Sequence, residues 1–452
     1  MRTVLVLGAG FSYAIDNKMP LTDDLGNLVR HRLPPVSARM PRNFTGGYFE
    51  AWLSRLAESQ PDLTAAQNAT NQGLFLEVAA ELARLLQERE LEVLQDKPKW
   101  WLQRLIGLLH ATRTTAITFN YDTLVERTAP YLRLGGWKDG SFAKPFNVVR
   151  NIPPGPPRGG WIVDRGADTF RLLKLHGSLD SYWVPGDQSG STIGREDVSG
   201  SWEDAKPVDE AKRRERFPGR EPYIVPPAAA KSAFYTNPIA RELWRTAAEE
   251  LGAAERIALV GYSLPPTDLV TSGMLADALS TGLKYVDVVN PYPDTVVDRL
   301  KALGQPDSNI RCTGGHDAAE QYTNQLEHEH GQHLATMLEK ADDSSNLLVG
   351  TSIHRVARVT GIRTRPDGVE LEVDQIGSVS RATEKDPHRT QPVVSVPELR
   401  AVLRHGSTAV VRYPDGAVAT VVTTSTYHTD VGLGNGHWIV LVPPAMPAGA
   451  SR

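Results

Sequence analysis

Short apolar runs alternate along the first three quarters of the chain with longer stretches in which apolar positions recur every three or four residues. The short runs are rich in β-branched residues and are bounded by Gly, Pro or Asn, which is typical of buried strands. We therefore predict strands at Thr3–Leu7, Thr114–Phe119, Phe170–Leu175, Arg256–Val260, Tyr285–Val289 and Asn309–Cys312.

The longer stretches have the spacing of amphipathic helices. Pro238 stands just inside the start of one of them and Gly252 just past its predicted end, in keeping with the preferences of Pro and Gly at helix ends. Strands that alternate with helices predict an α/β fold with a doubly wound, parallel, six-stranded, Rossmann-like sheet and helical insertions. The predicted helices are Leu74–Leu94, Trp100–Leu109, Ile239–Leu251, Leu269–Leu279 and Thr295–Leu303.

Polar stretches interrupt the alternation of predicted strands and helices, and a linker marks its end. Asn151–Gly166 and Val184–Pro222 are interpreted as insertions or loops, and the charge run Asp209–Arg216 as a solvated surface. Beyond the acidic and serine-rich linker Ala341–Ser345, residues 346–452 carry two Pro-Asp-Gly turns between alternating apolar strands, and one short helix that starts at Ser395. We predict a domain over residues 1–340 and a small, mostly β domain over residues 346–452.

Composition narrows the class of protein. The chain has 452 residues, 49 Lys and Arg against 53 Asp and Glu, and a single cysteine, Cys312. A net charge of −4 excludes an overall basic attraction to nucleic acid or anionic membranes. One cysteine excludes an intrachain disulfide framework and a zinc site made of several thiolates, and it fits a reducing cytoplasm. No apolar stretch is long enough to span a membrane, and Thr3–Leu7 is interpreted as a buried first strand rather than a signal peptide.

A glycine-rich turn follows the first predicted strand. In Gly8-Ala9-Gly10-Phe11-Ser12 the glycines allow a sharp turn and a close approach to a pyrophosphate, and a helix N-terminus follows. The third glycine of the usual dinucleotide fingerprint is missing, because Tyr13 occupies its place. The motif alone does not separate nucleotide binding from a tight strand–helix turn.

Polar residues also follow the second and third strands. Asn120 and Asp122 come after Thr114–Phe119, where they could face a ligand crevice or simply cap the next helix, and the motif alone favours capping. His176, after Phe170–Leu175, could act as a general base, although a single His is more often structural. We expect Asn120 and His176 to lie at the crevice rather than in the core.

Three further turns leave strands at the same predicted edge. They contain Gly261 and Ser263, then Asn290, then Gly315 and His316, and each on its own could be turn chemistry. Taken in order, the motifs Gly-Ala-Gly-x-Ser, Phe119-Asn120-Tyr121-Asp122, Leu175-His176-Gly177-Ser178 and Gly261-Tyr262-Ser263-Leu264-Pro265 resemble the sirtuin-like family of NAD-consuming enzymes. The resemblance covers residues 1 to about 335 and is strongest to the bacterial antiviral NADase branch, which includes the Thoeris effector.

Two departures separate the chain from sirtuins that deacylate proteins. Those enzymes carry a zinc ribbon of four cysteines after the His-Gly motif, and here the polar stretch Val184–Pro222 stands in that place. They also carry Gly-Ile-Pro-Asp-Phe-Arg after the first motif, whereas this chain has Lys18-Met19-Pro20-Leu21-Thr22-Asp23, in which the Arg is missing. The resemblance therefore favours NAD binding without metal over the handling of a peptide substrate.

The resemblance also implies a role for each candidate residue. Asn120 would orient the attacking water or the nicotinamide ribose, Asp122 would bind the nicotinamide carboxamide, and His176 would act as base. The remaining candidates would bind NAD: Gly8, Ala9, Gly10, Ser12, Gly261 and Ser263 at the pyrophosphate, Asn290 at the adenosine ribose, and Gly315 and His316 beside the adenine.

The expected activity is hydrolysis of NAD to nicotinamide and ADP-ribose, acting in antiphage defence by NAD depletion. Alternatives are an NAD-dependent protein deacylase or ADP-ribosyltransferase, and a non-catalytic nucleotide-binding partner protein. We expect a homo-oligomer, with a protein partner or trigger acting through residues 346–452. That region has eleven basic and nine acidic residues, so nucleic-acid binding is not expected of it.

Overall fold

The computed structural model describes most of residues 2–326 and the strands of the C-terminal region. The described residues are 2–33, 37–112, 114–131, 137–138, 141–142, 170–187, 189, 192–195, 202, 207, 209–228, 232–235, 237–326, 329, 346–349, 353–365, 368–380, 408–412, 418–429 and 436–442. The predicted insertion Asn151–Gly166, the linker Ala341–Ser345 and the predicted helix at Ser395 lie outside them.

Six parallel strands form the central sheet, in the order β11-β10-β9-β1-β2-β5. In chain order this is 3-2-1-4-5-6 read from one edge, the doubly wound arrangement whose strand order reverses between β1 and β9. The confirmed strands are β1 (Thr3–Leu7), β2 (Thr115–Thr118), β5 (Arg171–Lys174), β9 (Arg256–Val260), β10 (Tyr285–Val289) and β11 (Ile310–Thr313). Nearly every residue of β1, β2, β9 and β10 is buried, as expected for a sheet covered on both faces.

Helices fill the connections between these strands. All five predicted helices are present, and α10 starts as predicted, because Asn237 Oδ1 accepts a hydrogen bond from Ala240 N (2.8 Å). Its predicted end at Gly252 is wrong: the helix continues to Ala253, and a side chain at Gly252 would meet open space. The helices are α1 (Ala9–Ile15), α2 (Thr22–Arg32), α4 (Tyr48–Ala57), α5 (Ala65–Val93), α6 (Trp100–Thr112), α7 (Leu124–Tyr131), α10 (Pro238–Ala253), α11 (Leu269–Ser280) and α12 (Asp294–Ala302).

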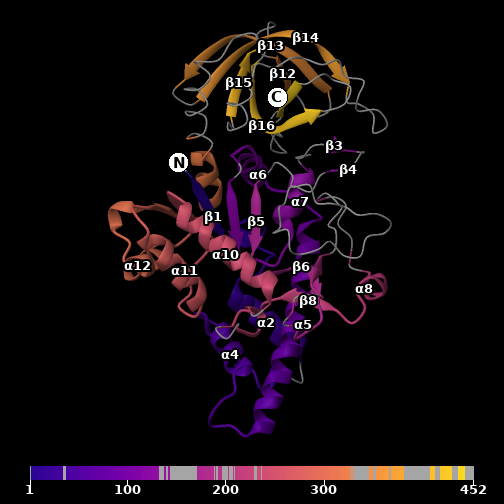
Figure 1. Ribbon diagram of the computed structural model, residues 1–452, viewed down its shortest axis with the longest axis vertical. Coiled ribbons are helices and arrows are strands. Elements are labelled where there is room, and N and C mark those ends of the chain that lie inside the picture. Colours follow the sequence, from indigo (N-terminus) through magenta and orange to yellow (C-terminus); the bar gives the residue numbers. More distant parts are fainter. Residues whose placement is uncertain are drawn as a thin grey trace.

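Two insertions extend the sheet domain. The helices α2, α4 and α5 pack together around Phe44, Phe49 and Leu53, and α5 projects away from the sheet in Figure 1. After β5, the strands β7 (Gly194–Arg195), β6 (Gly177–Trp183) and β8 (Glu221–Ile224) form a small antiparallel sheet. The charge run of this insertion is helix α8 (Glu210–Arg216), capped by Asp209 and largely exposed. Short strands β3 (Trp137–Lys138) and β4 (Ser141–Phe142) pair with each other before β5, and helix α9 (Ser232–Tyr235) follows β8.

The C-terminal strands close into a barrel, drawn above the sheet in Figure 1. β13 pairs antiparallel with β14, and β15 with β16; the predicted Pro-Asp-Gly turns fall between these strands in sequence, and all but Gly368 of their residues lie outside the described ones. The strands are β12 (Asn346–Val349), β13 (Ile353–Arg365), β14 (Gly368–Ser380), β15 (Thr408–Arg412), β16 (Val418–Thr429) and β17 (Gly436–Val442). The predicted mostly β character of this region is confirmed. None of the helices that the structure describes is both long and apolar enough to cross a membrane.

Candidate functional site

The glycine turns after β1 and β9 lie against each other at the point where the strand order reverses. Gly8 N donates to Val260 O (3.1 Å) and Gly10 N donates to Gly261 O (2.9 Å). Gly261 has a φ of +61°, and a Cβ there would lie 2.1 Å from Phe11 N. Because only a residue without a side chain allows this approach, the glycines explain how the two turns pack. The N–H groups of Gly8 and Gly10 are both used in this packing.

Ser12 connects this turn to the one after β2. Its Oγ donates to Asp122 Oδ2 (2.6 Å) and accepts from Asn120 Nδ2 (2.8 Å), and Asn120 Nδ2 also donates to Gly8 O (2.8 Å). Asp122 Oδ1 accepts from Leu124 N (3.3 Å) at the start of α7. Asp122 therefore contributes to the cap of α7 and also belongs to a buried polar cluster with Ser12 and Asn120.

His176 follows β5 and lies among aromatic rings. Its ring centroid is 4.9 Å from that of Phe119, the residue before Asn120, and its Nε2 lies 3.3 Å from Tyr235 Oη. Phe119 in turn stacks on Tyr262, with centroids 4.8 Å apart. Trp244 completes the group, 5.0 Å from Tyr235 by centroids. Phe119 thus joins the His176 turn to the Asn120 turn and to the β9 turn.

Burial corrects one expectation about this site. Asn120 is 8 % exposed and His176 is 5 % exposed, so both belong to the buried part of the domain rather than to an open crevice wall. Asn120 makes two side-chain hydrogen bonds there, and removing a buried hydrogen-bonding group of this kind costs about 1–3 kcal/mol. Substitution of Asn120 is therefore expected to lower stability as well as change any activity.

The remaining predicted residues lie along the same edge, further toward β11. Ser263 is exposed, and its carbonyl accepts from Arg299 Nη1 (2.6 Å). Asn290 Oδ1 accepts from Tyr292 N (3.0 Å), which is the turn chemistry that was the alternative interpretation. Gly315 N donates to Pro291 O (3.3 Å), and the exposed ring of His316 meets that of Tyr292 edge-on. Ala9 opens helix α1 beside Gly8.

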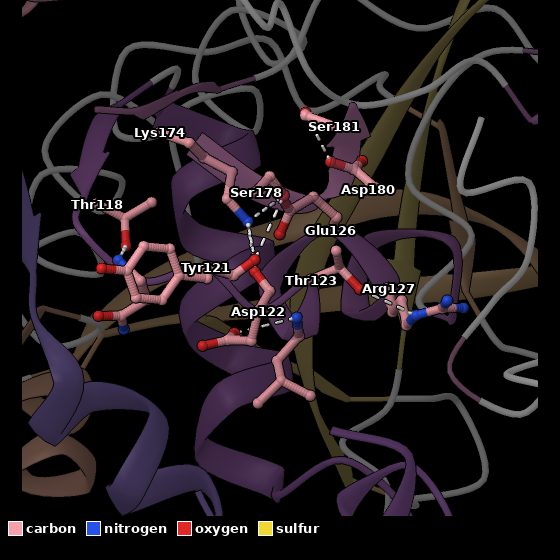
Figure 2. A network of polar contacts seen from close by, with 12 residues as sticks. Thr118, Tyr121, Asp122, Thr123, Glu126, Arg127, Lys174, Ser178, Asp180 and Ser181 are labelled. Carbon is pink, nitrogen blue, oxygen red and sulfur yellow. Dashed lines mark hydrogen bonds and ion pairs between the residues drawn. The ribbon is translucent and has the colours of Figure 1, made fainter. Parts of the chain in front are cut away.

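A second buried network lies behind the Asn120–Asp122 turn (Figure 2). Lys174, the last residue of β5, pairs with Glu126 Oε1 on α7 at 2.8 Å, with both side chains less than a tenth exposed. Burial raises the pKa of the Glu126 carboxyl. Burial also disfavours the charged form of Lys174, but the carboxylates of Glu126, Asp180 and Asp122 outweigh it and raise the pKa of Lys174.

Glu90 of helix α5 supports the same turn from another direction. Glu90 Oε1 accepts from Thr123 N (2.6 Å) and from Thr123 Oγ1, and Arg127 Nε donates to Thr123 Oγ1 (3.0 Å). Burial raises the pKa of Glu90 to about 7, with the charge of Asp122 acting in the same direction and Arg127 opposing it. The sequence interpretation missed Glu90, because nothing local connects it to a turn more than thirty residues later.

Lys174 and Glu126 were also not selected as functional residues. Lys174 stands two residues before His176, and Glu126 four residues after Asp122, so both lie close in sequence to the candidate residues. That proximity was the available signal. Within the described residues there is no group of three or more His, Cys, Asp or Glu side chains placed to hold a metal ion.

Known proteins were compared with the chain. No protein-family model and no curated protein matches it. Among solved structures, it is similar to a mutant Sir2 homologue in complex with ADP-ribose (14 % identity, 72 % of this chain, 90 % of the other, TM-score 0.36). It is also similar to a Sir2 homologue–NAD complex (15 %, 72 % and 89 %, 0.36) and to Sir2Tm bound to a propionylated peptide (16 %, 73 % and 93 %, 0.33). TM-scores below 0.5 do not by themselves establish a relationship, so the buried polar cluster at the point of strand reversal identifies the candidate site.

Proposed function

We propose that this protein hydrolyses NAD to nicotinamide and ADP-ribose at the carboxyl edge of the sheet, beside β1, β2 and β5. The observation that carries the proposal is the joining of Ser12, Asn120 and Asp122 in one buried cluster, with His176 packed against Phe119, the residue before Asn120. The order of the sequence motifs, which resembles the sirtuin-like NAD-consuming family, supplies the substrate class. Doubly wound sheets bind ligands at this edge, where the strand order reverses.

The chemistry needs polar groups in fixed positions. The bond between the ribosyl C1′ and the nicotinamide nitrogen breaks, and a bond from C1′ to a water oxygen forms. The reaction passes through a centre that resembles an oxocarbenium ion, which positioned amide, carboxylate and imidazole groups can stabilise. His176 would take the proton of the attacking water, Asn120 would orient that water or the ribose, and Asp122 would bind the carboxamide of the leaving nicotinamide.

Binding must exchange contacts that the side chains make in this structure. Asn120 Nδ2 donates to Gly8 O and Ser12 Oγ, and His176 Nε2 lies beside Tyr235 Oη. Bound NAD would replace some of these partners. NAD hydrolysis harms the cell that carries it out, so a resting state with satisfied side chains suits a role in antiphage defence by NAD depletion.

Product analysis separates the candidate functions. The full-length protein is incubated with NAD, with and without an acetylated peptide, and the products are resolved by chromatography. We expect nicotinamide and ADP-ribose in equal amounts whether or not the peptide is present. Release of nicotinamide only with peptide would indicate a deacylase. If NAD is unchanged both in this assay and in cells that express the protein during phage infection, the protein is not an NADase. The result would then support the alternative of a non-catalytic nucleotide-binding partner protein.

The barrel strands belong to a region that we propose regulates or assembles the enzyme. Ending the chain near Asp343 is expected to leave a folded domain that binds NAD, either active without a trigger or unable to self-associate. Turnover and molar mass, measured for both lengths of chain, test this. Identical values for both, with and without phage challenge in cells, would contradict a regulatory role.

A further inference from the structure

The ammonium group of Lys174 lies in a buried position that uses all of its hydrogen-bonding capacity. Its Nζ donates to Glu126 Oε1 (2.8 Å), to Tyr121 O (3.3 Å) and to Asp122 O, and the residue is 7 % exposed. Figure 2 shows the side chain pointing from β5 toward the backbone of the Tyr121–Asp122 turn. An ammonium carries three donors and no acceptor, so these three partners complete its set.

Residues that follow His176 in sequence also bind the turn that Lys174 binds. Leu179 N donates to Tyr121 O (2.9 Å), and Ser178 Oγ lies 3.4 Å from the same oxygen. Residues on both sides of His176 therefore bind the Tyr121 peptide. The peptide lies between Asn120 and Asp122, so its position sets where those two side chains stand relative to the imidazole.

We propose that Lys174 and Glu126 are a positioning pair that holds Asn120 and Asp122 in register with His176. This inference rests on the proposed NAD hydrolysis. Neither residue is assigned contact with the substrate. They act through the backbone of the turn, and Glu126 fixes the ammonium from the first turn of α7.

Stability alone does not explain a pair of this kind. Desolvation of two buried charges offsets most of their attraction, and well-packed apolar residues of similar volume are often as stabilising. A buried pair that also bonds two carbonyls of a candidate catalytic turn fixes geometry instead. Small displacements of reacting groups reduce catalysis strongly, because the barrier depends on their alignment.

A second buried lysine provides a matched control. Lys284 is 4 % exposed, and its Nζ donates to Gly252 O (2.8 Å) and Ala254 O (2.6 Å) at the end of α10. It precedes β10, at the amino edge of the sheet, opposite to the candidate site. Lys174 and Lys284 thus share burial and bonding to two carbonyls. They differ in the Glu126 carboxylate that pairs with Lys174, and in whether the carbonyls belong to the candidate catalytic turn.

The experiment compares Lys174→Met, Glu126→Gln and Lys284→Met in the full-length protein. Melting temperature is measured first, and then kcat and KM for NAD cleavage. Lys174→Met is expected to lower kcat about tenfold or more while KM stays within about threefold, because alignment rather than substrate contact is lost. Glu126→Gln is expected to lower kcat by a smaller factor, because the ammonium–carbonyl bonds remain. Lys284→Met is expected to lower the melting temperature with kcat within about twofold of wild type.

Each result bears on a separate claim. Wild-type kcat in folded Lys174→Met and Glu126→Gln proteins overturns the positioning role, as does an equal loss of kcat in Lys284→Met. If Lys174→Met does not fold, Glu126→Gln decides, and a kcat within about twofold of wild type overturns the proposal. A wild-type protein that does not cleave NAD contradicts the proposed function itself, which the product assay detects independently of these variants.

Discussion

The two pairs of turns at the carboxyl edge of the sheet are built in opposite ways. After β1 and β9, the backbones of Gly10 and Gly261 meet because no side chain stands between them. After β2 and β5, the turns meet through buried side chains, with Lys174 and Glu126 on one side and Glu90 on the other. A glycine can be identified from the local sequence alone. The buried polar network also includes Glu90, whose helix α5 is distant from these turns along the chain.

This difference predicts how each region responds to substitution. The glycine turns should tolerate almost no added volume, since backbone atoms form the contact and cannot move aside. The polar turns should respond to charge and pH, since their contacts depend on ionisable groups in a buried setting.

The largest effect is expected for Gly261→Ala. A Cβ at Gly261 would lie 2.1 Å from Phe11 N and 2.3 Å from Gly10 C, and the residue has a φ of +61°. Steric overlap with backbone and left-handed strain together are expected to lower the free energy of unfolding by about 3 kcal/mol or more. Chemical denaturation of the full-length protein measures this.

Gly273→Ala is the control for that substitution. Gly273 lies inside α11, is exposed, and has open space around the position of a Cβ. Alanine there should be neutral or stabilise the helix by up to about 1 kcal/mol. Similar losses in both variants would mean that close approach of the two turns is not what requires glycine at Gly261.

The next effect concerns the pH dependence of stability, through Glu90. Burial raises the pKa of Glu90 to about 7 from an ordinary value of 4.5. Between these values the unfolded chain loses the Glu90 proton while the folded protein keeps it. The contribution of Glu90 to the free energy of unfolding is therefore complete below about pH 4.5 and decreases until about pH 7. The accumulated loss is about 3 kcal/mol, and Glu90→Gln should abolish it.

Denaturation at a series of pH values from 4.5 to 8 tests this. The control is Glu92→Gln, which replaces an exposed carboxylate on the same helix, so that the loss of a charge from α5 can be separated from the loss of Glu90. A Glu90→Gln protein with the same slope of unfolding free energy against pH as wild type would show that Glu90 does not titrate in this range.

The smallest effect is expected for Ser12→Ala, which removes the side chain joining the two regions. Ser12 Oγ donates to Asp122 Oδ2 (2.6 Å) and accepts from Asn120 Nδ2 (2.8 Å). Losing both bonds should lower the free energy of unfolding by about 1–2 kcal/mol. A double-mutant cycle with Asn120→Ala should show coupling between the two residues. Additive losses would mean that the glycine and polar turns are independent.

Prediction from sequence succeeded where the determinant was local. The bounds of β1, β9 and β10 agree residue for residue, because each is a short buried run followed directly by Gly or Asn. The sharp turn at Gly8 and Gly10 was predicted for the same reason, but its close packing against Gly261 was not, since that contact joins segments far apart in the chain. Gly252 was misjudged as a helix stop, since glycine at an open position permits an ending without requiring one.

The polar turns could be predicted only in part. Asn120, Asp122 and His176 were found because they follow strands, but their burial was not, since it depends on the aromatic group of Phe119, Tyr235, Trp244 and Tyr262. The contribution of Glu90 depends on how α5 packs against the start of α7, and the sequence carries no local sign of that packing. The assigned roles of these residues in NAD chemistry remain predictions.

The most direct test of the central claim is NAD turnover by Asn120→Ala and His176→Ala under conditions in which the wild-type enzyme is active. Asn27→Ala is the control, because Asn27 also bonds backbone groups of another segment, Phe44 N (2.9 Å) and Phe44 O (3.1 Å), within the helical insertion. With folding verified by circular dichroism, both site variants are expected to lose turnover by about 10²–10⁴-fold, and Asn27→Ala is expected to keep it. Turnover near the wild-type rate in a folded Asn120→Ala or His176→Ala protein would contradict the assignment of that residue to NAD cleavage.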